Sequence, residues 1–135
     1  GVFWDRLFLN LKETKQPKLK NFIYKVYCRD IMTERLLFKM GIKQTELCYK
    51  CRNEIENSSH LFDRCVVTWR LWERLKDWFV LRTGLVVEFN LYNMLFTKKS
   101  RGENMVSRYL YPNGLRYIYT CKLNSTIPRF ERIFS

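Results

Sequence analysis

The sequence predicts a mostly α fold: a small helical domain organised around one Cys/Cys/His/Cys zinc site. Two observations predict the helices. Apolar residues recur at helical spacing in several segments, and little strand-like alternation is present. Hydrophobic residues make up 47% of the 135 residues, enough for a chain of this length to bury a substantial core. A third observation, the spacing of four potential metal ligands, predicts the zinc site: Cys48, Cys51, His60 and Cys65.

The first region, residues 1–44, is predicted to be a helical lead-in to the zinc motif. An apolar stripe at positions i, i+3, i+4, i+7 and i+8 indicates an amphipathic helix: Leu19, Phe22, Ile23, Val26 and Tyr27. Pro17 comes just before this stripe, where a first helical turn tolerates proline. Thr33 suits the N-cap of a second helix over residues 34–40. We therefore expect residues 18–40 to form a short helical hairpin.

The second region, residues 45–82, holds the zinc motif and the helix that follows it. We expect this helix to begin at Val66, to end near Leu81 and to be followed by Gly84 as its stop signal. One face of the helix is predicted to hold the large apolar residues that recur at helical spacing: Trp69, Trp72, Leu75 and Phe79. Basic residues occupy much of the remaining surface.

The third region, residues 83–135, is predicted to be basic and helical. Asn90 suits the N-cap of a brief helix that ends at Phe96, and a polar loop is expected over residues 98–103. Residues 104–123 again have a helical pattern, which we expect the strong turn signal Pro112-Asn113-Gly114 to interrupt. The three regions are expected to form one structural unit. Because the chain begins without Met and in mid-pattern, we expect it to be part of a longer protein.

The charge balance favours a polyanionic partner. The chain has 25 Lys and Arg residues against 13 Asp and Glu residues, which gives a net charge of +12. Residues 1–47 hold ten basic and five acidic side chains, residues 48–97 seven and six, and residues 98–135 eight and two. Two basic ends thus flank a near-neutral middle. A generally basic, solvated surface is the alternative, but a phosphate backbone explains the two excesses more easily.

The cysteines are expected to be reduced thiols in a nuclear or cytosolic setting. Their number, five, is odd, which argues against a closed disulfide framework. The first ten residues mix Trp, Asp and Arg with apolar residues, so no signal peptide is expected. No apolar run approaches the roughly 18–20 residues that a membrane span needs, so no membrane partner is expected. Reduced thiols are available to a metal.

The zinc motif is the most specific pattern in the chain. Two residues lie in its first gap, eight in its second and four in its third: Cys48, Cys51, His60, Cys65. Zinc prefers four tetrahedral ligands, and thiolate and imidazole suit its chemistry. Cys65 would lie at the start of a helix, where the helix N-terminus favours a thiolate. Because four protein ligands leave no position for an activated water, the motif predicts a structural site.

Two other interpretations of these residues are weaker. A redox Cys-x-x-Cys pair would need a preceding strand and a helix N-terminus of its own, whereas a polar loop precedes Leu47. The other alternative is a set of unrelated buried cysteines and a lone histidine. His60, however, is the only histidine in the chain and falls at a ligand position. Cys28 and Cys121 are predicted to be packed thiols and not ligands.

Two stretches of the chain carry the zinc motif: Leu47-Cys48-Tyr49-Lys50-Cys51, and Ser59-His60-Leu61-Phe62-Asp63-Arg64-Cys65 followed by Trp69 and Trp72. Together they resemble the zinc-binding segment near the C-terminus of reverse transcriptases from LINE-type (non-LTR) retrotransposons. The flanks are similar too: residues 19–27 and 36–42 resemble the family's helical lead-in, and residues 116–123 with Pro128 and Phe130 resemble its trailing helix. The sequence departs from the family pattern at residues 110–114, where the family usually has a continuous apolar helix.

The resemblance implies an accessory role in a larger enzyme. In such elements this region follows the polymerase and helps to hold the element's RNA and the target DNA during target-primed reverse transcription. The segment itself is predicted not to be an enzyme, because its aspartates are isolated and it has no cluster of carboxylates for a nuclease. The implied cofactor is Zn²⁺, and no small-molecule substrate is expected. A ribonucleoprotein of this kind is expected in the nucleus and cytoplasm.

The sequence therefore predicts a module that binds RNA and/or DNA and the rest of its parent reverse transcriptase. Phosphate contacts are assigned to basic residues in all three regions: Lys12, Lys15, Lys18, Lys20, Lys50, Arg52, Lys98, Lys99, Arg101, Arg116 and Lys122. Lys50 and Arg52 could equally offset the negative charge of the thiolates. Four tyrosines could stack on bases or pack in the core: Tyr49, Tyr109, Tyr117 and Tyr119. The alternative function is a protein-interaction scaffold whose interface is supplied by Trp69, Trp72 and Trp78.

Overall fold

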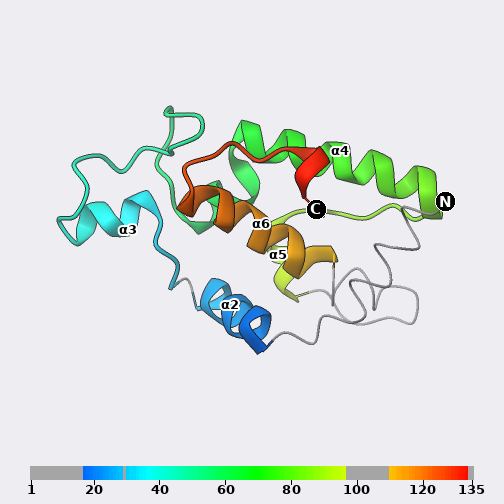
Figure 1. The fold of residues 1–135 in the computed structure, drawn as a ribbon, viewed down its shortest axis with the longest axis horizontal. Coiled ribbons are helices and arrows are strands. Elements are labelled where there is room, and N and C mark those ends of the chain that lie inside the picture. The colour runs from blue at the N-terminus through cyan, green and yellow to red at the C-terminus, as the bar shows by residue number, and fades with distance from the viewer. Residues whose placement is uncertain (1–16, 29, 97–109, 134–135) are drawn as a thin grey trace.

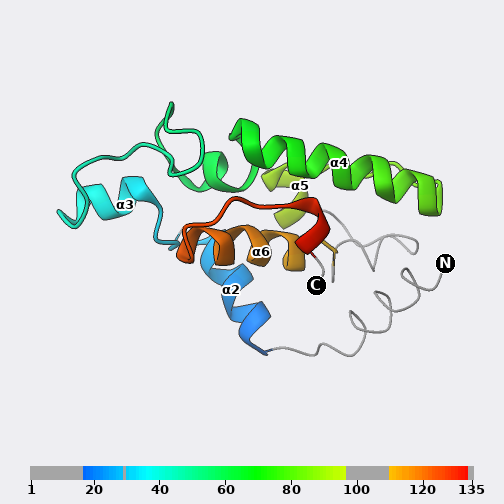
Figure 2. The ribbon, with the colours of Figure 1, turned by 45° about the horizontal axis from the view of Figure 1, so that its top comes forward.

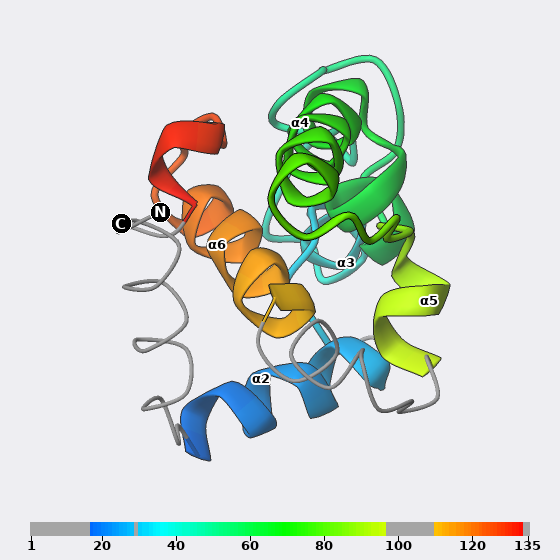
Figure 3. The ribbon, with the colours of Figure 1, turned by 90° about the vertical axis from the view of Figure 1, so that its right-hand side faces the viewer.

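The computed structural model describes residues 17–28, 30–96 and 110–133. In these residues the fold is mostly α, as predicted, and its only β-type pairing is an isolated antiparallel bridge between Leu47 and Ile55. The elements follow in the order α2 (Pro17–Tyr27), α3 (Glu34–Lys39), the π-helical turn η1 (His60–Arg64), α4 (Val66–Thr83), α5 (Leu91–Phe96), α6 (Tyr111–Leu123) and the 3-10 turn η3 (Phe130–Arg132). α4 is the longest helix, and α6 lies between α4 and α2 (Figures 1 and 3).

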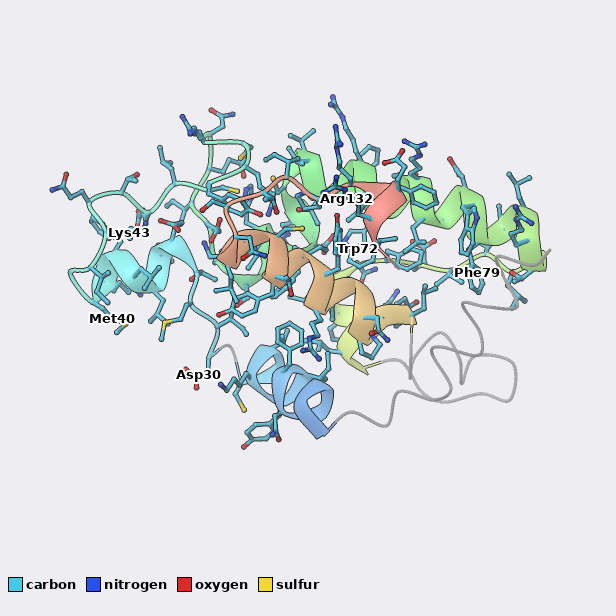
Figure 4. All side chains as sticks on the ribbon, in the orientation of Figure 1. Asp30, Met40, Lys43, Trp72, Phe79 and Arg132 are labelled. Atoms are coloured by element: carbon cyan, nitrogen blue, oxygen red, sulfur yellow. The ribbon has the colours of Figure 1, made fainter. Side chains whose placement is uncertain are left out.

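The core forms where α4, η1 and α6 meet. Trp72 is 2% exposed and lies between α4 and α6 (Figure 4). Its indole Nε1–H donates a hydrogen bond to the carbonyl oxygen of Phe62 at 2.6 Å, and its ring stacks on Phe89 with ring centroids 5.0 Å apart. Because one face of its ring and its polar N–H both have partners, Trp72 has little freedom to move. It thereby fixes the position of α4 relative to η1.

The predicted break at Pro112-Asn113-Gly114 is wrong, because α6 runs without interruption from Tyr111 to Leu123. Pro112 lies in the first turn, where its missing N–H has no intrahelical partner to lose. Gly114 lies under the ring of Trp72: a Cβ on Gly114 would come within 2.6 Å of the Cη2 atom of Trp72. The glycine that looks like a turn signal is thus a packing residue that lets α6 approach Trp72 closely.

The two helices of the lead-in do not pair as the predicted hairpin. α2 packs against α6 through Phe22, whose ring stacks on Tyr119 at 5.5 Å, and through the buried Val26. α3 lies away from α2, at one end of the molecule (Figures 1 and 2). No residue of α3 is buried, although its predicted N-cap is present, with the Leu36 N–H bonded to Thr33 Oγ1 at 3.2 Å.

The boundaries of the remaining helices follow local signals. α4 ends at Thr83, and Gly84 follows in the left-handed conformation with φ 74°, as expected for a helix stop. Asn90 caps α5, since its Oδ1 accepts the Asn93 N–H at 2.8 Å. None of the helices in the described part of the chain combines the length and apolar composition that a membrane crossing requires.

The apolar face of α4 differs from the prediction at one position. Trp72, Leu75 and Phe79 are buried, but Trp69 is 52% exposed. Thr68 and Leu71 complete the buried face instead. The buried face of α4 is therefore rotated away from Trp69, toward η1 and α6. The predicted polar loop at residues 98–103 lies outside the described residues.

We expect Gly114→Ala to lower the free energy of unfolding by about 1–2 kcal/mol. Overpacking should cost about 2–3 kcal/mol here, the upper part of the usual range, because the added Cβ would lie 2.6 Å from Trp72 and Trp72 cannot shift without losing its hydrogen bond to Phe62. The higher helix propensity of alanine returns about 1 kcal/mol of this. Denaturant unfolding measures the difference.

Thr120→Ala is the matched control for this prediction, since Thr120 is exposed on the same helix. It should change the stability by no more than about 0.5 kcal/mol. If Gly114→Ala were as stable as the parent protein, the close contact between α6 and Trp72 would not exist in solution.

Candidate metal centre

A tight backbone turn places the first two predicted ligands side by side. The Cys48 N–H donates to the carbonyl oxygen of Glu54 at 2.8 Å, and the Arg52 N–H donates back to the Cys48 carbonyl at 2.9 Å. Arg52 adopts a positive φ of 54°, which closes the turn after Cys51. Together with the bridge between Leu47 and Ile55, these bonds make residues 46–56 a short hairpin with both thiols at its tip.

The π-helical turn η1 positions the other two ligands. In such a turn an N–H bonds to the carbonyl five residues earlier, and here the Cys65 N–H donates to the His60 carbonyl at 3.0 Å. The spacing of five residues therefore brings His60 and Cys65 together across one hydrogen bond. Asn57 starts the turn, because its Oδ1 accepts the His60 N–H at 2.8 Å. Cys65 is then the N-cap residue of α4, as the sequence predicted.

The four ligand atoms lie close enough together to bind one ion. One ligand atom from each of Cys48, Cys51, His60 and Cys65 lies within 4.8 Å of the others. The Cys48 and Cys65 Sγ atoms are 3.9 Å apart, and the Cys51 Sγ is 3.3 Å from His60 Nε2. Around a tetrahedral zinc, with bonds of about 2.3 Å to sulfur and 2.0–2.1 Å to nitrogen, such edges measure about 3.8 and 3.5 Å. Two observed edges thus match a zinc tetrahedron.

The electrostatics of the thiols also favour a bound cation. The pKa of Cys65 is lowered, first by the hydrogen bond that Cys48 donates to it and then by the N–H groups of Val67 and Thr68 at the start of α4. The pKa of Cys48 is raised, because it is the donor in this bond and because it is buried. The hydrogen bond between the two sulfurs requires a proton on one of them. A cation in place of that proton allows both sulfurs to ionise.

Lys50 contributes positive charge next to these sulfurs. Its Nζ donates to the carbonyl oxygen of Leu61 at 3.2 Å and lies 4.9 Å from the centre of the Tyr49 ring. Burial lowers the pKa of Lys50, while the nearby thiols Cys48 and Cys65 act in the opposite direction. This position favours the interpretation that Lys50 offsets thiolate charge over the one in which it contacts phosphate. Arg52, by contrast, is exposed at the tip of the hairpin.

Lys122 is buried and paired inside the protein, so its predicted role as a phosphate contact is wrong. Its side chain is 6% exposed and pairs with Glu34 at 2.9 Å and with Glu56. Glu56 itself is fully buried. Because its ammonium is paired inside the protein, Lys122 has no free charge to offer a phosphate. Nothing in the sequence distinguishes the buried Glu56 from Glu54, whose side chain is 70% exposed beside His60.

The other predicted phosphate contacts are placed only in part. Lys18 and Lys20 belong to α2, and Arg116 lies on α6 and is partly buried. The remaining predicted contacts lie outside the described residues: Lys12, Lys15, Lys98, Lys99 and Arg101. These assignments stay predictions.

Three of the four tyrosines predicted to stack on bases lie in the described residues, and all three pack against the core. The Tyr49 hydroxyl donates to the Thr126 carbonyl at 3.0 Å, and the Tyr117 hydroxyl donates to the Arg129 carbonyl at 3.1 Å. Tyr119 stacks on Phe22. These contacts favour core packing over base stacking for all three, and Tyr109 lies outside the described residues. Of the two cysteines outside the site, Cys121 is buried as predicted, but Cys28 is exposed and is not a packed thiol.

We expect Cys51→Ser to abolish stoichiometric zinc binding and to lower the melting temperature. Metal binding to small zinc peptides is worth about 10–16 kcal/mol, and residues 45–59 have few apolar residues that could replace this contribution. Chelation should likewise unfold residues 45–66 while α4 stays largely formed. Metal analysis, thermal melting and hydrogen exchange measure these effects.

The matched control is Cys28→Ser, which removes an exposed thiol away from the four ligands. It should keep one zinc per chain. Unchanged metal content and melting in Cys51→Ser would refute the assignment of this ligand.

Comparison with known proteins agrees with this geometry. A family model described as zinc-binding in reverse transcriptase matches residues 2–72. Searches of the curated proteins and of the solved structures found no match. The matched residues include all four ligands and end within α4. They span more than half of the chain, and the chain therefore belongs to the family of zinc-binding domains in reverse transcriptase.

Proposed function

We propose that this zinc module binds nucleic acid, RNA and/or target DNA, for a LINE-type reverse transcriptase and so supports target-primed reverse transcription. The observation that supports this most strongly is the net charge of +12 on a chain from a zinc-binding family of reverse transcriptase. The substrates of a reverse transcriptase are nucleic acids. A positive module in the same protein adds phosphate contacts to those of the polymerase.

The zinc site supplies rigidity for this function. With the ion bound, residues 46–56 form a fixed hairpin instead of a polar loop, and Arg52 is held exposed at its tip. A basic residue on a fixed backbone loses less conformational entropy when it meets a phosphate than one on a flexible loop. The basic residues of the two ends, at 1–47 and 98–135, supply most of the remaining charge.

The module acts in this proposal as an accessory segment and not as a catalyst. Its four protein ligands fill the tetrahedral positions of zinc, so no site remains for a water or a substrate atom. Its partners are RNA and/or DNA and the rest of the parent polypeptide, without a membrane or a small-molecule substrate. The setting is a ribonucleoprotein of the nucleus and cytoplasm.

A second candidate, a scaffold that docks onto the parent polymerase, is favoured by one surface. α3 and the turn after it expose Phe38 by 43%, Met40 by 53% and Ile42 by 61%. Met40 and Lys43 lie at the end of the molecule, away from α4 and α6 (Figure 4). The tryptophans named for this role support it less, since Trp72 is buried and Trp78 packs against Phe130. Only Trp69 among them is largely exposed.

A titration with single-stranded RNA and with duplex DNA at several salt concentrations tests the proposal. Each phosphate contact should contribute about −0.7 to the log-log salt slope for single strands and about −0.9 for duplex DNA. Arg52→Gln should reduce the magnitude of the slope by roughly one contact. Lys76→Gln, whose parent side chain pairs with Glu88, is the matched control and should leave the slope unchanged.

Absence of binding at low salt would rule out the nucleic-acid proposal and leave the scaffold as the remaining function. Binding whose strength does not depend on salt would have the same consequence, since phosphate contacts release counterions.

A further inference from the structure

A single buried carboxylate, that of Glu56, connects three separate parts of the fold. Its Oε2 accepts the N–H of Tyr49 at 3.3 Å, in the turn between the ligands Cys48 and Cys51. Its Oε1 accepts the N–H of Glu34 at 3.0 Å, at the start of α3, and also pairs with the ammonium of Lys122, at the end of α6. Its side chain is 0% exposed. The zinc hairpin, α3 and α6 therefore meet at one side chain.

The backbone of Glu56 strengthens the same junction. Its N–H donates to the carbonyl oxygen of Glu46 at 2.9 Å, across the hairpin, and its own carbonyl accepts the N–H of Arg35 at 3.2 Å. Every hydrogen-bonding group of this residue that faces the hairpin or α3 thus has a partner. A residue with so many fixed partners holds the hairpin in one position relative to both helices.

The ammonium of Lys122 stabilises the negative charge of the buried Glu56 carboxylate. A buried carboxylate without a counter-ion is strongly unfavourable, and Glu34 adds a second carboxylate beside the first. Lys122 Nζ contacts both and lies 5.2 Å from the centre of the Tyr49 ring. Removing this ammonium would leave two carboxylates facing each other in a buried space. Glu56 would then be driven to turn away from the Tyr49 N–H.

We infer that Glu56 is a positioning residue for the metal and that Lys122, which is not one of the four ligands, controls zinc affinity through it. Glu56 fixes the Tyr49 N–H and with it the turn from Cys48 to Cys51. A turn that is already fixed loses less conformational entropy when the ion binds, so affinity is higher. Loss of Lys122 would therefore leave the turn from Cys48 to Cys51 less ordered, through its effect on Glu56.

The coupling acts in both directions. If Lys122 favours the zinc-bound hairpin, zinc must favour the pairing of Lys122 by the same free energy. Metal loading therefore also secures the end of α6 and the start of α3 against the hairpin. The zinc ion organises the C-terminal helix as well as its own loop.

Zinc affinity, measured by competition with a chromophoric chelator, tests this inference. Lys122→Met should weaken zinc binding by about tenfold, the lower end of what outer-shell substitutions cost. Lys76→Met removes a lysine from the exposed pair with Glu88 and should stay within about twofold of the parent, as expected for a surface pair. Equal affinities for Lys122→Met and Lys76→Met would overturn the inference.

A second substitution separates positioning by Glu56 from a general packing defect. Glu56→Gln in the Lys122→Met background removes the unpaired charge but keeps an oxygen that can accept the Tyr49 N–H. The double variant should recover most of the lost affinity, because the two effects are not additive. A double variant that binds zinc no better than Lys122→Met would show that the defect does not act through the Glu56 charge, and would also overturn the inference.

Hydrogen exchange of the unmodified protein provides a test that needs no variant to fold. Removing zinc should speed exchange at the end of α6, residues 119–123, more than at residues 76–83 of α4. Unchanged exchange at residues 119–123 would contradict the coupling. A protein that binds no zinc in any of these experiments would refute the metal assignment itself, which is a separate outcome from zinc binding that ignores Lys122.

Discussion

Three sulfur atoms and one imidazole nitrogen within 4.8 Å of one another form the constraint on which the rest of the structure depends. The buried Cys48 and Cys65 Sγ atoms lie 3.9 Å apart, and the hydrogen bond between them lowers the pKa of Cys65 and raises the pKa of Cys48. A divalent cation allows both thiols to ionise, and it joins two short segments that have little apolar surface of their own. The hairpin at residues 46–56 and the turn η1 then become one rigid body.

The helices α4 and α6 meet this rigid body through the hydrophobic core, to which η1 contributes Leu61 and Phe62. η1 packs against both α4 and α6, and the Trp72 N–H reaches back to the Phe62 carbonyl. Gly114 lets the ring of Trp72 lie directly on α6. On the other side of the hairpin, α3 is joined by the Glu56 carboxylate and buries no residue. The fold thus has an apolar junction on one side of the metal and an ionic junction on the other.

Local features of this fold were predictable from the sequence. The ligands Cys48 and Cys51, the caps Thr33 and Asn90, and the stop at Gly84 depend on residues a few positions apart, whose chemistry the sequence states directly. The π-helical turn was not foreseen, although the spacing of five between His60 and Cys65 is the interval that its hydrogen bond spans. That spacing is the signal that could have revealed it.

Features that depend on distant residues were missed. The sequence alone predicts that Lys122 is a surface cation, because its partner Glu34 lies 88 residues earlier in the chain. Pro112 and Gly114 together predict a turn. The sequence does not show that Pro112 lies in the first turn of a helix or that Gly114 faces Trp72. Trp69 and Trp72 share a helical spacing, yet only the packing of α4 on η1 decides which of them is buried.

X-ray absorption spectroscopy at the zinc edge of the purified protein examines the constraint from which all of this follows. The structure predicts three sulfur neighbours at about 2.3 Å and one nitrogen neighbour at about 2.0–2.1 Å, with no oxygen ligand. A first shell that contains oxygen, or fewer than three sulfurs, would contradict the closed four-ligand centre and the accessory, non-catalytic role proposed from it.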